Sequence, residues 1–280
     1  MKLTKVFCKK TITFLSGISF LSIIFSPFPA AADNSREYHL DLIKETVLAA
    51  AGLSFTLAGS HLIAHVHAPD PASLNRNDVP GIDRMALDRE SKNADNFSDI
   101  MLDISSFLPC ITAASMLFRE SQVSNSQVIA DLVMYAESSL IISGLTGIAK
   151  GSFHRSRPYA YDPSVSLATR GKRDASLSFF SGHTSAAFNG AVFACSVFQR
   201  QHPKSKLIIP FWIFGLSAAT ATAIMRVEAG MHFPTDVLAG AVAGSFTGWL
   251  IPRLHEGTPK RFEVITVVNG AHGCGIKYHF

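Results

Sequence analysis

The sequence is short of charge. Asp, Glu, Lys and Arg make up 16% of its 280 residues, against about 25% in an ordinary soluble domain. Cysteine is also scarce, and four cysteines in a chain of this length exclude a disulfide-stapled scaffold. Apolar residues reach 48%, which is enough for a large core and argues against a disordered chain. The composition therefore predicts one large apolar domain or two small ones.

A basic surface is missing as well, although the formal net charge is +4. Residues 1–32 contain four lysines (Lys2, Lys5, Lys9 and Lys10) and no acidic residue, and the rest of the chain holds 21 basic and 21 acidic residues. Outside residues 1–32 the chain therefore has no excess of basic over acidic residues, so we expect no nucleic-acid partner.

Residues 1–32 have the pattern of a secretory signal peptide. The lysines precede an apolar run from Thr11 to Phe25, and Ala30-Ala31-Ala32 offers a small-residue cleavage site. We therefore expect export with cleavage, and the alternative is an uncleaved membrane anchor.

Six apolar segments follow and predict an all-α fold, a bundle of about six core helices within residues 33–252. The segments cover about residues 46–66, 104–118, 128–149, 184–199, 207–225 and 237–251. In the last of them Gly240, Gly244 and Gly248 recur at four-residue steps, which allows a neighbouring helix to approach closely.

The tail, residues 253–280, changes period. Val264, Thr266 and Val268 alternate with other residues and are followed by Asn269-Gly270, a turn dipeptide. This pattern predicts a short β-hairpin, and a disordered tail is the alternative.

Eight residues with side chains or backbone suited to catalysis or anion binding fall into three groups, each at the end of an expected helix. Two polar connectors, residues 67–97 and 150–182, interrupt the helices, and long connectors in a compact domain are usually functional. The groups are Lys150 with Arg157, then Ser181-Gly182-His183, then Arg226 with His232 and Asp236.

In order and spacing this set resembles the three-part signature of the type 2 phosphatidic acid phosphatase (PAP2) and vanadium haloperoxidase superfamily. The resemblance covers roughly residues 40–252 and favours the phosphatase branch. Two positions depart from the family pattern: Phe180 stands where proline is common, and Met225 where serine is common. Neither position carries the chemistry, so the departures concern loop shape and substrate fit.

The residue types themselves suit phosphoryl transfer. Lys150, Arg157 and Arg226 supply three cations for the phosphoryl oxygens. Ser181 can donate its hydroxyl, and Gly182 lets a helix N-terminus come close to the phosphate.

The remaining residues of the set provide proton transfer and a nucleophile. We expect His232 to attack phosphorus, with Asp236 four residues later supporting the imidazole. His183 would protonate the leaving alcohol and then activate water. No metal and no other cofactor is expected.

Alternative functions remain open from the sequence. A vanadium-dependent haloperoxidase would have the same set of site residues, and a soluble periplasmic acid phosphatase would have the same fold. A third alternative is a catalytically inactive envelope protein, which would hydrolyse no phosphate ester. The spacing of His61, His65 and His67 could suit a metal site, but no carboxylate or cysteine precedes Asp70 in a ligand-like pattern, so histidines at a helix end without a metal are the favoured interpretation. Asp131 and Glu137 interrupt the third segment and suit either a functional role in a membrane or a polar interior.

The membrane arrangement is the open question. The first, third and fifth segments approach the roughly 20 residues that a span needs, and the other three are shorter. We expect the protein in the cell envelope, associated with the membrane, with its site facing the periplasm. If the exported N-terminus is followed by three crossings, however, Lys150 lies on the inner side. The substrate would be a phosphorylated lipid or a small phosphate ester, and the oligomeric state is left open.

Overall fold

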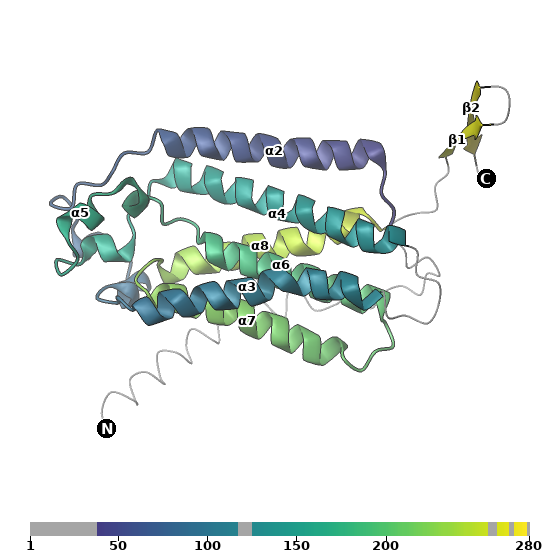
Figure 1. The fold of residues 1–280 in the computed structure, drawn as a ribbon. Helices are drawn as coiled ribbons and strands as arrows, with labels where there is room; N and C mark the ends of the chain where they lie inside the picture. Colours follow the sequence, from purple (N-terminus) through teal and green to yellow (C-terminus); the bar gives the residue numbers. More distant parts are fainter. Residues whose placement is uncertain (1–37, 117–124, 257–261, 269–271, 279–280) are drawn as a thin grey trace.

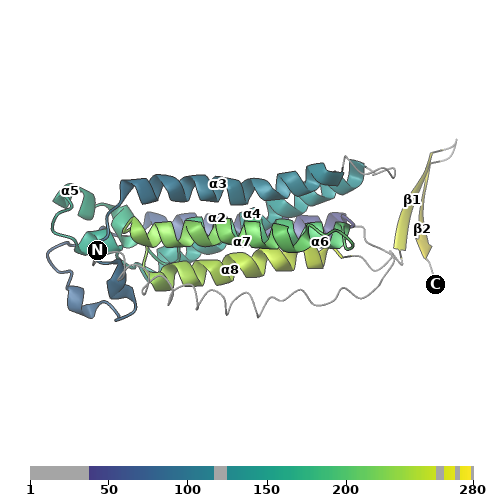
Figure 2. The same ribbon diagram turned by 90° about the horizontal axis from the view of Figure 1, so that it is seen from below.

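The computed structural model describes residues 38–116, 125–256, 262–268 and 272–278 (Figure 1). Within these ranges six long helices form a bundle, and successive helices run in opposite directions (Figures 1 and 2). They are α2 (Leu42–Ala64), α3 (Lys92–Ser115), α4 (Asn125–Phe153), α6 (Gly182–Gln201), α7 (Ile208–Glu228) and α8 (Pro234–Leu254). The predicted all-α bundle is confirmed, whereas the expected signal peptide, residues 1–32, lies outside the described residues.

The helices that the sequence predicts to be short are longer in the structure. Helices α3, α6 and α8 have 24, 20 and 21 residues. α3 begins twelve residues before its apolar segment, because its first half is polar and starts at the N-cap Ser91, whose side chain accepts from the N–H of Ala94. Five helical segments are long and apolar enough to cross a membrane, as in a membrane protein: α2, α3, residues 126–161 around α4, α7 and α8.

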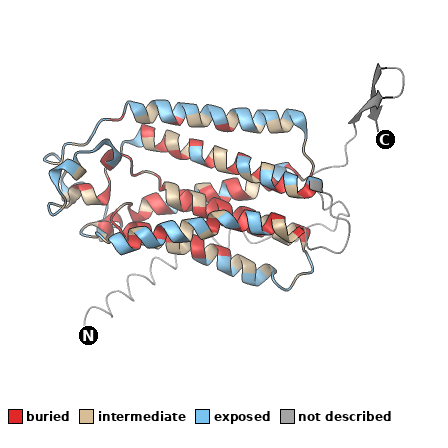
Figure 3. Cartoon of the chain, in the orientation of Figure 1, coloured by how far each residue is buried: buried red, intermediate tan, exposed pale blue. Residues whose placement is uncertain are grey.

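Helix α6 lies inside the bundle, whereas α2 lies on its outside. α6 packs against α3, α4, α7 and α8 and is buried over most of its length (Figure 3). α2 packs mainly on α4 and is largely exposed, although it is apolar (Figure 3). Its exposed side chains include Leu42, Ile43, Val47, Leu53 and Leu57. An exposed apolar face of this size suits contact with lipid.

The predicted glycine face of α8 packs against α6. A Cβ added to Gly240, Gly244 or Gly248 would lie 2.7, 2.1 or 2.4 Å from a main-chain oxygen of the first turns of α6. Any side chain at these positions would force the two helices apart. The contact holds the N-terminal turns of α6 and α8 side by side.

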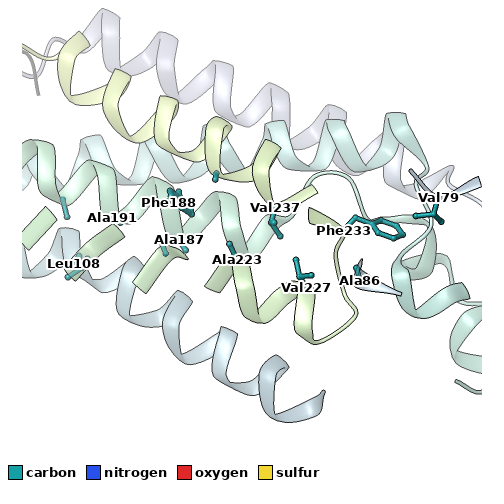
Figure 4. Packing of buried hydrophobic residues seen from close by; sticks show 13 residues of the cluster. Val79, Ala86, Leu108, Ala187, Phe188, Ala191, Ala223, Val227, Phe233 and Val237 are labelled. Atoms are coloured by element: carbon teal, nitrogen blue, oxygen red, sulfur yellow. The ribbon is translucent and has the colours of Figure 1, made fainter. Parts of the chain in front are cut away.

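The two connectors fold onto the same end of the bundle. The first contains the short 3-10 helices η1 (Arg76–Asp78) and η2 (Asp83–Ala86), and the second contains η4 (Pro158–Tyr161), α5 (Leu167–Arg170) and η5 (Arg173–Ser176). Val79 and Ala86 of the first connector join the core that contains Phe233 and Val227 (Figure 4). The connectors are therefore part of the packed structure.

The tail forms the predicted hairpin. Strands β1 (Phe262–Val268) and β2 (His272–Tyr278) pair antiparallel, with Val268 opposite His272. The predicted turn, Asn269-Gly270, lies outside the described residues.

Candidate active site

The three groups of residues meet at the end of the bundle where α4 and α7 end and α6 and α8 begin (Figures 1 and 2). The backbone N–H of Ser181 donates to the carbonyl oxygen of Asp236 at 3.1 Å. A Cβ added to Gly182 would lie 3.8 Å from Nζ of Lys150. Residues from three separate parts of the sequence are thus neighbours in one cluster.

Arg157 is fixed by its surroundings. Its Nε and Nη2 donate to the carbonyl and to Oδ1 of Asp174, each at 3.0 Å, and Nη1 donates to the carbonyl of Met231 at 3.2 Å. The side chain is buried. The guanidinium therefore needs little reorganisation to bind an anion.

The other two cations have donors that the described residues leave open. Nη1 of Arg226 donates to Oδ1 of Asp95 at 2.6 Å and to Oγ of Ser98 at 3.2 Å, whereas its buried Nε has no partner there. Lys150 forms no ion pair within residues 38–116 and 125–256. Because unpaired buried donors are costly, these groups suit an anionic ligand with several acceptor oxygens.

The turn after α7 places His232 beside Arg226. Gly230 has φ +68°, and the N–H groups of Met231 and His232 fold back to the carbonyl of Arg226 at 3.1 and 3.3 Å. A Cβ on Gly230 would lie 1.9 Å from the carbonyl oxygen of Arg89. Only glycine combines this left-handed conformation with this close approach.

His232 is held as a neutral ring with a defined tautomer. Its Nδ1 lies 2.8 Å from the carbonyl oxygen of Ser178. A carbonyl can only accept, so Nδ1 carries the proton and Nε2 keeps its lone pair. Burial lowers the pKa of His232 well below its ordinary value, and the nearby Arg157 and Lys150 lower it further. The ring is therefore uncharged at neutral pH, with its lone pair at Nε2.

Asp236 supports His232 less directly than the sequence predicts. Its Oδ2 lies 3.8 Å from Nδ1 of His232, within reach of the ring. The hydrogen bonds of Oδ2, however, come from Oγ of Ser178 at 2.6 Å and from the N–H of Phe233 at 2.9 Å. Asp236 thus orients the residue whose carbonyl holds the imidazole.

Ser181 and Gly182 open helix α6. Ser181 is its N-cap, and Oγ accepts from the N–H and from Oγ1 of Thr184 at 3.4 and 3.0 Å. Because Oγ is the acceptor in both bonds, its own proton is left to donate to a ligand. The helix begins at Gly182, and its positive end lies beside Lys150.

His183 pairs with a carboxylate that the motif analysis misses. Its Nε2 lies 3.0 Å from Oδ1 of Asp99 in α3. Burial lowers the pKa of His183, with a further decrease from Arg226, while Asp99 acts in the opposite direction. Asp95 and Asp99 lie four residues apart on α3, and this spacing in its polar first half was the available signal.

A second missed group anchors the start of α8. Asp83 of η2 is fully buried and accepts from the N–H and Oγ1 of Thr235 at 3.0 and 2.8 Å and from Nη2 of Arg155 at 2.6 Å. Nη1 of Arg155 donates to Oδ1 of Asp236 at 2.5 Å, and its guanidinium lies 4.4 Å from the centre of the Phe233 ring. Asp83 therefore ties the first connector to the residues that position His232.

The remaining candidates lie elsewhere. His61 and His65 are exposed, and Nδ1 of His65 donates to the carbonyl of His61 at 2.8 Å. In the described part of the chain, one group of side chains lies close enough together to bind a metal ion: Glu45, Glu137 and His255, at the opposite end of the bundle. His61, His65 and His67 are not part of it. The buried Asp131 accepts from Nε2 of Gln201 at 2.7 Å, which agrees with a polar interior.

Parts of the sequence are similar to known proteins, and the family match includes the residues of this cluster. The sequence model of the PAP2 superfamily matches residues 131–259. The lipid A 4'-phosphatase of Bacteroides thetaiotaomicron is 30% identical over 107 residues, which cover 38% of this chain and 44% of that protein. The bacitracin transport permease protein BcrC of Bacillus licheniformis is 32% identical over 128 residues, covering 44% and 57%. The chain thus spans about half the length of these relatives.

The first transmembrane PAP2-type phosphatidylglycerolphosphate phosphatase from Bacillus subtilis aligns with 76% of this chain and 99% of its own, at a TM-score of 0.47 and 24% identity.

Proposed function

We propose that this chain is a member of the PAP2 superfamily, whose sequence model matches residues 131–259, and that it is a membrane phosphatase that hydrolyses phosphate monoesters or diphosphates of lipids through a phosphohistidine. The observation that carries the proposal is the neutral His232 ring, which keeps a lone pair at Nε2 and has Lys150, Arg157 and Arg226 as its charged neighbours. One relative is named as a phosphatase of lipid A, which supports a lipid substrate.

In the first step Nε2 of His232 attacks phosphorus. The bond from phosphorus to the leaving oxygen breaks, and that oxygen keeps the electron pair and takes a proton from His183. The three cations stabilise the charge on the equatorial oxygens without a metal ion. The carbonyl of Ser178 accepts a hydrogen bond from Nδ1–H throughout, which stabilises the positive ring of the phosphohistidine.

In the second step water releases the phosphate. His183, now neutral, takes a proton from a water molecule, and the water oxygen attacks phosphorus. The bond from phosphorus to Nε2 breaks, its electron pair returns to His232, and inorganic phosphate leaves. Asp99 stabilises the protonated state of His183 that each step uses or restores.

A lipid substrate fits the surroundings of the site. Phe97 and Ile100 of α3 and Leu238 of α8 are 44, 54 and 43% exposed and lie within two residues of Asp99 or Asp236 in the sequence. Exposed apolar side chains beside a cationic cluster suit a substrate with a phosphate head and an acyl or prenyl tail. The exposed apolar helices favour this reading over a soluble acid phosphatase.

Phosphate release from a substrate panel tests the proposal. The purified protein should act on phosphatidate, a prenyl diphosphate or lipid A with kcat/KM at least about tenfold above that for a soluble aryl phosphate, because the tail adds binding energy. Equal rates on all substrates would contradict a lipid phosphatase, and no release from any would contradict phosphatase function.

Replacement of Asp99 by Asn should move the alkaline limb of the kcat/KM profile to lower pH. A general acid must be protonated, so the rate falls as pH rises through the pKa of His183, and loss of Asp99 lowers that pKa. We expect about a tenfold loss at pH 8 for an alkyl phosphate and a smaller loss for an aryl phosphate. Asp103→Asn, an exposed position one turn further on, is the matched control. An unchanged alkaline limb in Asp99→Asn would exclude this role.

The direction of the helices bears on which side of the membrane the site occupies. Leu42 starts α2 at the end of the bundle opposite the site (Figure 1). If α2, α3 and α4 all cross, the residues before α2 and the site lie on opposite sides, so export of the N-terminus and a periplasmic site exclude each other. We propose that the site faces the periplasm and that residues 1–41 stay on the cytoplasmic side. The four N-terminal lysines favour that side, and the run Thr11–Phe25 is shorter than the roughly 20 residues of a span.

Cysteine labelling tests this orientation. On a background without the native cysteines, Ser164→Cys, exposed in the second connector, should react with an impermeant thiol reagent in intact spheroplasts. Lys204→Cys, exposed between α6 and α7 at the opposite end, should react only after lysis. The reverse pattern would place the site in the cytoplasm and restore the exported N-terminus.

A further inference from the structure

Three ligand-type side chains meet at the end of the bundle away from the candidate active site. They are Glu45 in the first turn of α2, Glu137 of α4 and His255 at the C-cap of α8. Nε2 of His255 lies 2.9 Å from Oε2 of Glu45 and 3.4 Å from Oε2 of Glu137, and the three ligand atoms lie within 4.8 Å of one another.

Two acidic side chains face one imidazole in this cluster, at the short distances given above. Nδ1 of His255 donates to the carbonyl oxygen of Ile251 at 2.8 Å, which leaves Nε2 as the ring nitrogen that faces the two carboxylates. Glu137 is 6% exposed, and its Oε2 has no hydrogen-bond partner in the described part of the chain. There, neither carboxylate forms an ion pair with a Lys or Arg side chain. Buried carboxylate oxygens that face each other repel unless a proton or a metal ion lies between them.

We propose that Glu45, Glu137 and His255 bind one divalent transition-metal ion through Nε2 and one oxygen of each carboxylate. Imidazole nitrogen with carboxylate oxygen suits Zn²⁺, Mn²⁺ or Fe²⁺. Ligand atoms about 2.0–2.1 Å from an ion are about 3.3 Å apart in tetrahedral geometry and about 3.0 Å apart at the corners of an octahedron. The observed distances of 2.9 and 3.4 Å are close to these values. The bond from Nδ1 to a backbone carbonyl is the outer contact that metal-binding histidines usually make.

The ion acts as a clamp between helices and takes no part in turnover. Glu137 precedes Lys150 by thirteen residues, which at 1.5 Å per residue separates them by about 20 Å along α4. α2 packs mainly on α4 and is otherwise largely exposed. An ion shared by Glu45, Glu137 and His255 would fasten α2 to α4 and to the end of α8.

Metal content and thermal unfolding of the full chain in detergent test the proposal. After chelation and dialysis, Zn²⁺ should bind at about one ion per chain and raise the unfolding midpoint by about 5–10 °C at a concentration about 100 times Kd. Glu137→Gln and His255→Gln should abolish both effects. His65→Gln, an exposed histidine outside the cluster, should keep them.

Two further measurements make the test decisive. Co²⁺ added to the wild-type protein should give a visible ligand-field absorption band, a readout that does not depend on any variant folding. No stoichiometric Zn²⁺, Mn²⁺ or Co²⁺ binding by folded wild-type protein, or equal binding by the Gln variants, would overturn the proposal.

The metal proposal and the proposed function are tested separately. The initial rate of phosphate release at 25 °C should persist in chelator, so a protein without phosphatase activity would count against the proposed function alone.

Discussion

Replacement of His232 by Ala is expected to reduce kcat by at least about 10⁴-fold, with helical content and unfolding midpoint little changed. In the proposed mechanism the ring forms the bond to phosphorus, and no other described side chain in the cluster combines a neutral lone pair with three surrounding cations. Loss of a covalent nucleophile typically costs this much or more. Steady-state phosphate release and far-UV circular dichroism on the same preparations measure both quantities.

His67→Ala provides the matched control, because His67 is exposed in the first connector and should leave kcat unchanged. Trapping with ³²P-labelled substrate adds a direct readout. His183→Ala with an aryl phosphate should accumulate an acid-labile, base-stable protein label, because the first step needs little protonation and the second step lacks its base. His232→Ala should show no label. Label that persists in His232→Ala would place the nucleophile elsewhere.

The sequence predicted the fold class well and the helix lengths less well. Apolar runs mark where a helix is buried or meets lipid, so α2 and α7 were found with nearly correct lengths, whereas α4 has 29 residues and extends beyond its apolar segment at both ends. α3 was underestimated because its first half carries Asp95, Asp99 and Asp103 on a helix that packs only partly. α8 begins three residues before its apolar run, at Pro234, which suits the first turn of a helix.

The candidate site could be predicted only where its residues lie close together in the sequence. Lys150 and Arg157 share one motif, and His232 and Asp236 share another, so spacing alone suggested that each pair acts together. Asp99 lies 84 residues from the His183 that it contacts, and no local pattern links the two. The hydrogen bond from His232 to the carbonyl of Ser178 leaves no trace in side-chain identity, because any residue has a carbonyl.

Asp83 is the missed residue with the largest expected effect on stability. It is fully buried and accepts three hydrogen bonds: two from Thr235 at the start of α8 and one from Arg155. Asp83→Ala leaves the guanidinium of Arg155 half paired and an N–H of the first turn of α8 without its acceptor. Removing one partner of a buried ion pair costs about 3–5 kcal/mol, so the unfolding midpoint should fall by about 10 °C.

The same substitution should also reduce kcat more than it raises KM. Arg155 bridges Asp83 to Asp236, and Asp236 orients the Ser178 carbonyl that holds His232. Loosening the bridge lets the ring rotate, which weakens the attack on phosphorus more than the binding of phosphate by the three cations. Asp78→Ala in the same connector removes an exposed carboxylate and should change neither quantity. If Asp83→Ala unfolds 10 °C lower yet keeps the wild-type kcat below its midpoint, Asp83 holds the connector in place and has no part in positioning His232.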